Sequence, residues 1–215
     1  MKVGVLISGR GSNLKALIDA CATPGFPARI VLVISNREDA EGLSVARAAG
    51  IPSLVIDHKQ YETREAFDVE LDHALHAAGV ELVCNAGFMR ILSDGFVERW
   101  KDRQLNIHPS LLPAYKGLQT HERALADGVR ITGCTVHFVR PAMDEGPIVA
   151  QAAVPVLPGD TSQTLGERVL QAEHAVYPHA LRLVASGRTR IVDEQVLIDG
   201  DGGDISAPLF VPQIF

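Results

Sequence analysis

Short apolar runs alternate with amphipathic segments of helical length over the first hundred residues, and this alternation limits the possible folds more than any other feature. The apolar runs have the length of strands, whereas the segments between them repeat apolar side chains at helical spacing. Strands that alternate with helices form right-handed β-α-β units and a parallel sheet with helices on both faces. The expected strands are KVGVLI (2–7), RIVLVIS (29–35), IPSLVID (51–57) and ELVCNAG (81–87), and the expected helices cover 12–22, 42–50 and 64–79.

The pattern changes after residue 100, where β-rich runs follow one another. QLNIH predicts a further strand and HERALADG a short helix. The runs ITGCTVHFV and PIVAQAAVPV flank the turn-like segment RPAMDEG, which predicts an antiparallel hairpin attached to the parallel sheet. A long helix is expected from Thr161 to Gly187, kinked at Pro178, and then a small terminal hairpin.

These elements predict one α/β domain over residues 1–200. We expect a Rossmann-like, mostly parallel sheet with helices on both faces and an antiparallel C-terminal extension. Its two halves, about 1–100 and 101–200, should meet at a cleft, and an irregular tail should cover residues 201–215. A chain of 215 residues is long enough to bury one sizeable core.

Charge and composition exclude several classes of protein. The formal net charge of −6 argues against nucleic-acid or membrane-surface binding, because both need a basic face. The start MKVGVLISGRGSN does not resemble a signal peptide, and no segment has the apolar length of a membrane helix. The three cysteines lie far apart without a C-x-x-C spacing, which is typical of buried cytoplasmic thiols. The sequence therefore predicts a cytoplasmic protein that acts on small molecules.

The segment SGRGSN (8–13) lies between the first expected strand and the first expected helix, which Ser12 or Asn13 should cap. Glycines allow close approach of a ligand, and the free N–H groups of a helix start favour an anion. A dinucleotide fingerprint would need glycine at Leu14 and an acid at Asn36, and the P-loop lysine is absent. A sugar phosphate fits this turn best, although an unliganded glycine turn would look the same.

In LNIHPSLLP (105–113), Asn106 and His108 share one face of the expected strand, which Pro109 should end. Open α/β sheets bind their ligands at such strand ends. Asp144 lies in the turn of the expected hairpin, and a return toward His108 would orient the imidazole and favour its charged form. An amide, an imidazole and an acid at one point suit acyl transfer to an amine, with the amide stabilising the oxyanion.

Two further groups of residues have a weaker signal. NAGFMRILS (85–93) follows the fourth expected strand, and its apolar side chains either line a site for a flat heterocycle or pack in the core. His73 and His76 lie three residues apart on a helix, but no third ligand accompanies them, so we expect no metal site.

Taken together, these motifs resemble the glycinamide ribonucleotide formyltransferases, folate-dependent enzymes of purine biosynthesis. The resemblance extends from about residue 2 to about residue 190. It depends on VLISGRGSNL, AGFMRILS, LNIHPSLLPAYKG, GCTVHFV…MDEGPIVAQ and EHAVYP, in that order.

The resemblance implies direct transfer of the formyl group of 10-formyltetrahydrofolate, the co-substrate, to the amine of glycinamide ribonucleotide through a tetrahedral intermediate. It implies catalytic roles for Asn106, His108 and Asp144. The residues that match the phosphoribosyl site are Gly11, Ser12, Asn13 and Glu173. The residues that match the folate site are Arg64, Met89, Arg90, Ile91, Leu92, Asn106, Arg140, Met143 and Asp144.

The chain departs from the family at one point, because Gln119 replaces the first histidine of a common His-Thr-His motif and loses its titratable ring. The main alternative function is formyltetrahydrofolate hydrolase, which the resemblance associates with an additional N-terminal domain. A formyltransferase acting on methionyl-tRNA should have a further C-terminal domain and a basic surface. A non-catalytic folate or nucleotide-binding module would not need all three catalytic residues. We expect a monomer or homodimer.

Overall fold

The computed structural model of this chain describes residues 1–200 and residue 211, so the predicted irregular tail over 201–215 lies almost wholly outside the described residues. Over the described residues, seven strands form one sheet in the order β3-β2-β1-β4-β5-β6-β7. These strands are β1 (Lys2–Ile7), β2 (Arg29–Ser35), β3 (Ser53–Val55), β4 (Leu82–Asn85), β5 (Gln104–His108), β6 (Ile131–Phe138) and β7 (Ile148–Pro155).

The predicted fold class is confirmed. Strands β1 to β5 pair in parallel, whereas β6 pairs antiparallel with both β5 and β7. The predicted terminal hairpin is also present as a separate sheet of β8 (Thr189–Val192) and β9 (Gln195–Ile198). The chain winds from β1 outward to β3 and then returns to place β4 on the other side of β1. This reversal creates a topological switch point between β1 and β4, where open α/β sheets bind ligands.

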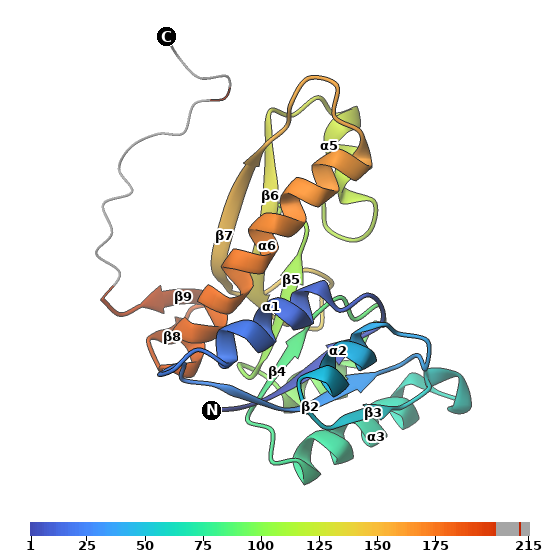
Figure 1. Ribbon diagram of the computed structural model, residues 1–215. Coiled ribbons are helices and arrows are strands. Elements are labelled where there is room, and N and C mark those ends of the chain that lie inside the picture. Colours follow the sequence, from blue (N-terminus) through green and yellow to red (C-terminus); the bar gives the residue numbers. More distant parts are fainter. Residues whose placement is uncertain (201–210, 212–215) are drawn as a thin grey trace.

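Helices cover both faces of the sheet (Figure 1). One face packs against helices α1, α2 and α6, and the other against α3 and α4. The helices are α1 (Ser12–Cys21), α2 (Gly42–Ala48), α3 (Arg64–Ala77), α4 (Asp94–Arg99), α5 (Thr120–Ala126) and α6 (Ser162–Ala185), with a 3-10 turn at His58–Gln60. Figure 1 shows α1 and α6 on the same face of the sheet, where they pack against each other, so segments far apart in the sequence lie side by side.

Local differences from the expectations have physical explanations. Gly11, in the left-handed region with φ 78°, occupies the N-cap of α1, so the expected cap by Ser12 or Asn13 is wrong. At α6, Thr161 is the N-cap as expected and forms a capping box with Thr164. The helix α6 continues through Pro178. The short helix α4 was not expected, because its six residues are fewer than periodicity can detect.

Three large buried aromatic side chains lie on the face covered by α3 and α4. Phe67, Phe96 and Trp100 pack there with apolar residues of β1, β2 and β4. Within residues 1–200 and 211, no helix is long and apolar enough to span a membrane. Because helices cover both faces of the sheet, polar side chains collect at the carboxyl ends of β1, β4 and β5.

Candidate active site

Asn106 and His108 lie at the carboxyl end of β5 on one face of the sheet, as their spacing requires, while Ile107 packs in the core on the other face. The antiparallel pairing with β6 places Asn106 opposite His137 and His108 opposite Thr135. The strand ends at His108, directly before Pro109. Two adjacent strands thus present four polar side chains on the same face.

His108 and Asp144 are brought together. His108 is 5% exposed, and its Nδ1 lies 3.4 Å from Asp144 Oδ2. On the other side of the ring, Nε2 lies 2.9 Å from the Tyr115 carbonyl oxygen. An acceptor oxygen therefore faces each nitrogen of the ring, which fixes the orientation of the imidazole. Asp144 Oδ2 also accepts a 2.7 Å hydrogen bond from the Gly117 N–H, which holds the carboxylate in place.

Asn106 is oriented by a buried histidine. Its Nδ2 lies 3.2 Å from His137 Nε2, while His137 Nδ1 lies 3.0 Å from the Phe138 carbonyl oxygen. That carbonyl can only accept, so His137 Nδ1 carries the hydrogen and Nε2 accepts from the Asn106 amide. Burial lowers the pKa of His137, which keeps the ring neutral and its Nε2 able to accept. The amide group of Asn106 therefore has a defined orientation, with its second N–H unused by this bond.

The backbone around His108 is held in costly conformations. Tyr115, Gln119 and Asp144 all have positive φ, at 53°, 55° and 50°, although none of them is glycine. Such conformations cost about 1–2 kcal/mol each for residues with a side chain. The Tyr115 conformation accompanies the carbonyl contact to His108, and the Asp144 conformation accompanies the carboxylate contact. Strain of this kind collects at functional sites.

The turn after β1 is pressed against the start of α2. A Cβ atom on Gly11 would lie 2.5 Å from Gly42 Cα, so only glycine fits there. The Gly42 N–H donates to the Gly9 carbonyl oxygen at 3.0 Å. Because α1 begins at Ser12, its free N–H groups point into this turn. The turn is therefore closely packed against α2, and the free N–H groups at the start of α1 suit an anion.

Asn13 and Glu173 join the two ends of the chain beside this turn. Asn13 Nδ2 donates to Glu173 Oε2 at 2.6 Å, and both side chains are buried. Burial raises the pKa of Glu173, and the Asn13 hydrogen bond opposes part of that rise. Asn13 Oδ1 is buried without a hydrogen-bond partner within the described part of the chain. A buried acceptor without a partner is costly unless a ligand donor reaches it.

The segment after β4 exposes apolar side chains. Met89 and Ile91 are 66% and 57% exposed, whereas Leu92 is buried in the core. Neither of the two interpretations of this segment holds for all of its residues, because Leu92 packs in the core and its neighbours face outward. Arg90 is exposed, and Met143, 55% exposed, lies on the same turn as Asp144.

The two arginines that the resemblance assigns to folate differ in their surroundings. Arg64 is the first residue of α3 and lines a pocket of about 340 Å³ together with residues of α4. Arg140 pairs with Asp102 and Glu194, each at 2.7 Å. Its guanidinium group is thus held by carboxylates of the protein itself.

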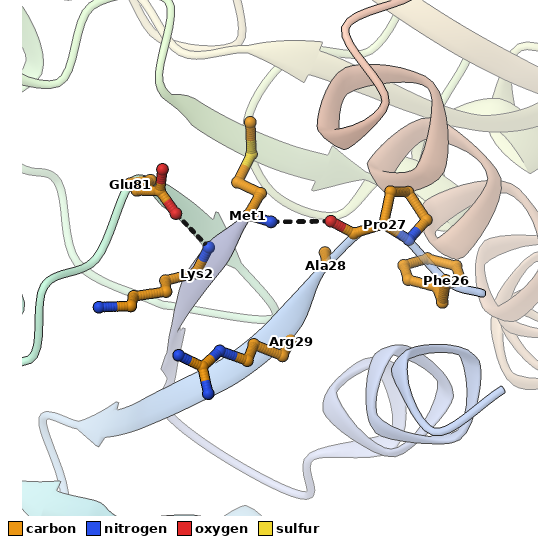
Figure 2. Close-up of a pocket in the computed structure, with 7 residues that line it drawn as sticks. All are labelled: Met1, Lys2, Phe26, Pro27, Ala28, Arg29 and Glu81. Atoms are coloured by element: carbon orange, nitrogen blue, oxygen red, sulfur yellow. Dashed lines mark hydrogen bonds between the residues drawn. The ribbon is translucent and has the colours of Figure 1, made fainter. Parts of the chain in front are cut away.

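A pocket of about 380 Å³ opens at the opposite edge of the sheet (Figure 2). Met1, Lys2, Arg29 and Glu81 line it at the amino ends of β1, β2 and β4, with the Met1 amine donating to the Pro27 carbonyl oxygen. The amino ends of parallel strands are not where such sheets bind ligands. Among residues 1–200 and 211, no three His, Cys, Asp or Glu side chains form a metal-binding group.

Several site residues were not singled out from the sequence. His137 and Ser8 each contact a candidate residue, and Thr135 supports the turn after His108 by donating to the Ser110 carbonyl oxygen at 2.7 Å. A signal for Thr135 and His137 existed, because these polar residues lie two apart in a strand and so share a face. No local pattern marks Ser8, whose partner lies 81 residues away.

Comparisons with known proteins agree with this arrangement. A family model for formyl transferases matches residues 1–181. The chain is 46% identical to the phosphoribosylglycinamide formyltransferase of Escherichia coli K12, covering 93% of this chain and 94% of that protein. It is 56% identical to the trifunctional purine biosynthetic protein adenosine-3 of Gallus gallus, covering 89% of this chain but only 19% of that longer protein.

A solved structure supports the same assignment. The crystal structure of glycinamide ribonucleotide transformylase 1 from Symbiobacterium toebii matches with a TM-score of 0.90 at 50% identity, covering 92% of this chain and 93% of that one. The matched regions include the turn after β1, the carboxyl ends of β4 and β5, and the hairpin of β6 and β7. The chain belongs to the formyl transferase family.

Proposed function

We propose that this protein transfers the formyl group of 10-formyltetrahydrofolate to the amine of glycinamide ribonucleotide, a step of purine biosynthesis in the cytoplasm. The observation that carries the proposal is the contact of His108 with Asp144 beside Asn106, between an anion-binding turn and an exposed apolar segment. The relatives and solved structures of the same name support this substrate pair.

The phosphoribosyl group binds in the N-terminal half, at about residues 1–100. Its phosphate lies on the N–H groups that Gly11, Ser12 and Asn13 present at the start of α1. Glu173 reaches this point from α6 and accepts from the ribose hydroxyls, a role that its buried position beside Asn13 supports. The unpartnered Asn13 Oδ1 fits a ribose hydroxyl donor.

The folate binds in the half formed by about residues 101–200, against the segment after β4. The exposed side chains of Met89 and Ile91, with Met143 on the facing hairpin turn, suit the apolar faces of a flat heterocycle. Arg90 and Leu92 belong to the same segment, and Arg64, which lines a pocket at the start of α3, meets the negative glutamate end of a folate. Because the Arg140 guanidinium group is held by two carboxylates, we assign its contact to the backbone of the turn from Arg140 to Asp144.

The chemistry is a direct transfer in which the acceptor amine attacks the formyl carbon. A carbon–nitrogen bond forms to the amine, and the bond to the folate nitrogen breaks. Negative charge develops on the formyl oxygen, where the free N–H of Asn106 and the protonated ring of His108 stabilise it. The attacking amine loses a proton and the departing folate nitrogen gains one. Asp144 keeps His108 oriented while this happens. No metal ion takes part.

The test is product formation from the two purified substrates without added metal or nucleotide. We expect formylated glycinamide ribonucleotide and one equivalent of tetrahydrofolate. Product no greater than the enzyme-free control would refute the proposal. Release of formate at equal rates with and without the ribonucleotide would indicate a formyltetrahydrofolate hydrolase instead.

A further inference from the structure

A buried serine joins the two substrate-binding segments of the site at the topological switch point. Ser8 directly follows β1 and begins the turn that ends at Gly11. Its Oγ accepts a 2.8 Å hydrogen bond from the Met89 N–H in the segment after β4. Since β1 and β4 are neighbours in the sheet, this bond crosses the line where the winding of the chain reverses.

The Ser8 hydroxyl takes part in a second hydrogen bond. It donates its single hydrogen to Asn36 Oδ1 at 2.6 Å, so toward the Met89 N–H the Ser8 oxygen acts only as an acceptor. Asn36 is buried after β2, where its side chain lies 3.1 Å from His58 Nδ1. The Ser8 oxygen therefore links the segments that follow β1, β2 and β4, and a change in its position changes the position of the Met89 backbone.

The segment 86–92 forms few other hydrogen bonds within the described residues, although Phe88 and Leu92 pack against the core. The Ala86 N–H donates to the Leu6 carbonyl oxygen at its start, and the Ser93 N–H donates to Asp68 Oδ2 at 2.6 Å just after its end. Between these two points, the side chains of Met89 and Ile91 are largely exposed, whereas the Met89 N–H is held. A shift of Ser8 is thus transmitted through the Met89 N–H to the residues whose side chains are exposed.

We propose that Ser8 is a positioning residue that couples the binding of the two substrates, a role that rests on the proposed function. An anion in the turn 9–11 orders the backbone adjoining Ser8, and the Ser8–Met89 bond passes that order to the folate-binding segment. The converse follows by thermodynamic linkage, because each ligand must change the affinity for the other by the same factor. One buried hydrogen bond is worth about a two- to tenfold change in an equilibrium constant, which sets the size of the coupling.

The experiment measures binding of tetrahydrofolate by calorimetry, with and without saturating glycinamide ribonucleotide. This pair carries no formyl group, so no reaction follows. In the unaltered protein, we expect the ribonucleotide to lower the Kd of tetrahydrofolate about two- to tenfold. In Ser8→Ala, each ligand alone should still bind, but the ratio of the two Kd values should fall to about one. The reverse titration must give the same factor.

Ser35→Ala is the matched control, because it also removes a buried hydroxyl near Asn36. The Ser35 hydroxyl donates to the Arg37 carbonyl oxygen at 2.7 Å and contacts neither substrate-binding segment. We expect this variant to keep the coupling of the unaltered protein. Equal loss of coupling in Ser35→Ala would mean that general loosening of the sheet edge is responsible, and it would overturn the proposal.

The remaining outcomes separate the two proposals. Failure of the unaltered protein to bind either ligand would overturn the proposed function. Binding of both ligands with no coupling, or with coupling retained in Ser8→Ala, would overturn the role of Ser8 and leave the proposed function standing. In the full reaction, Ser8→Ala should raise the KM values more than it lowers kcat, because the Ser8 hydroxyl is bonded to Asn36 and Met89 and not to the proposed catalytic residues.

Discussion

Asp144 Oδ2 lies 3.4 Å from His108 Nδ1 and 2.7 Å from the Gly117 nitrogen, so one carboxylate oxygen orients both an imidazole and the loop that follows it. The hairpin turn between β6 and β7 supplies Asp144, whereas β5 supplies His108. The site is therefore complete only when the antiparallel extension is added to the parallel sheet.

Asp144→Asn should lower kcat about 100-fold or more, in the range that a proton-transferring group contributes. Asparagine tolerates the positive φ of this position, and its oxygen can still accept from Gly117, so the fold should be kept. What disappears is the negative charge beside His108. Steady-state kinetics with both substrates saturating would measure the effect.

Glu145→Gln is the control for this change. Glu145 neighbours Asp144 in the chain but pairs with Lys116 at 2.6 Å on the surface. The kcat of the Glu145→Gln variant should equal that of the unaltered protein. Normal turnover in Asp144→Asn would rule out a part for the carboxylate in the reaction.

Asn106→Ala should lower kcat about 10²- to 10³-fold, because one oxyanion donor is worth that much in rate. Asn106→Asp should lower kcat similarly, since aspartate has nearly the same size but no N–H to donate to His137 or to the developing oxyanion. Single-turnover measurements would separate this chemical step from binding. If kcat fell strongly in Asn106→Ala but not in Asn106→Asp, the loss would come from the cavity that alanine leaves and not from the missing N–H donor.

Gly11→Ala should destabilise the protein and abolish tight binding of the ribonucleotide. The new methyl group would lie 2.5 Å from Gly42 Cα, and φ at this position is 78°. Gly50→Ala isolates the cost of the backbone conformation, because φ is 68° there but no atom lies within 4 Å. We expect a cost of about 1 kcal/mol at Gly50 and a larger one at Gly11. Urea unfolding of both variants measures the difference; equal costs would disprove the contact argument.

The free energy of unfolding should fall as the pH decreases below about 6.5. Burial lowers the pKa values of His121, His137 and His174 in the folded protein, so the unfolded chain binds protons more readily in this range. The double variant His121→Gln/His174→Gln should therefore lose less stability between pH 7 and pH 5 than the unaltered protein. Urea unfolding at the two pH values tests this. The same loss of unfolding free energy in the double variant and the unaltered protein would contradict it.

Periodicity was sufficient to predict the sheet, the covering helices and the shared face of Asn106 and His108, because each depends on neighbours in the sequence. The hairpin was predictable for the same reason. The contact of Asp144 with His108 was inferred from chemistry and from the resemblance, since no local pattern specifies how far a turn folds back. The role of each site residue remains a prediction.

The expectations that were wrong or missing depend on tertiary packing. Asn13 does not cap α1, because its amide donates to Glu173 of a helix that begins 149 residues further along the chain, at Ser162. The pairing of Arg140 with Asp102 and Glu194 was not expected, because it depends on elements far apart in sequence, and the assignment of Arg140 to folate stays a prediction. Such contacts cannot be predicted from local sequence patterns, because they form only when distant elements pack together.

The Asn13–Glu173 hydrogen bond has a consequence for the protein as it leaves the ribosome. The glycine turn is synthesised first, but its partner carboxylate follows 160 residues later. A nascent chain that stops short of α6 has the sheet's first strands and the turn, yet it lacks Glu173, one wall of the proposed ribose site. Under the proposed function, substrate binding therefore begins only when α6 has docked against α1, and a stalled or truncated product does not sequester the ribonucleotide.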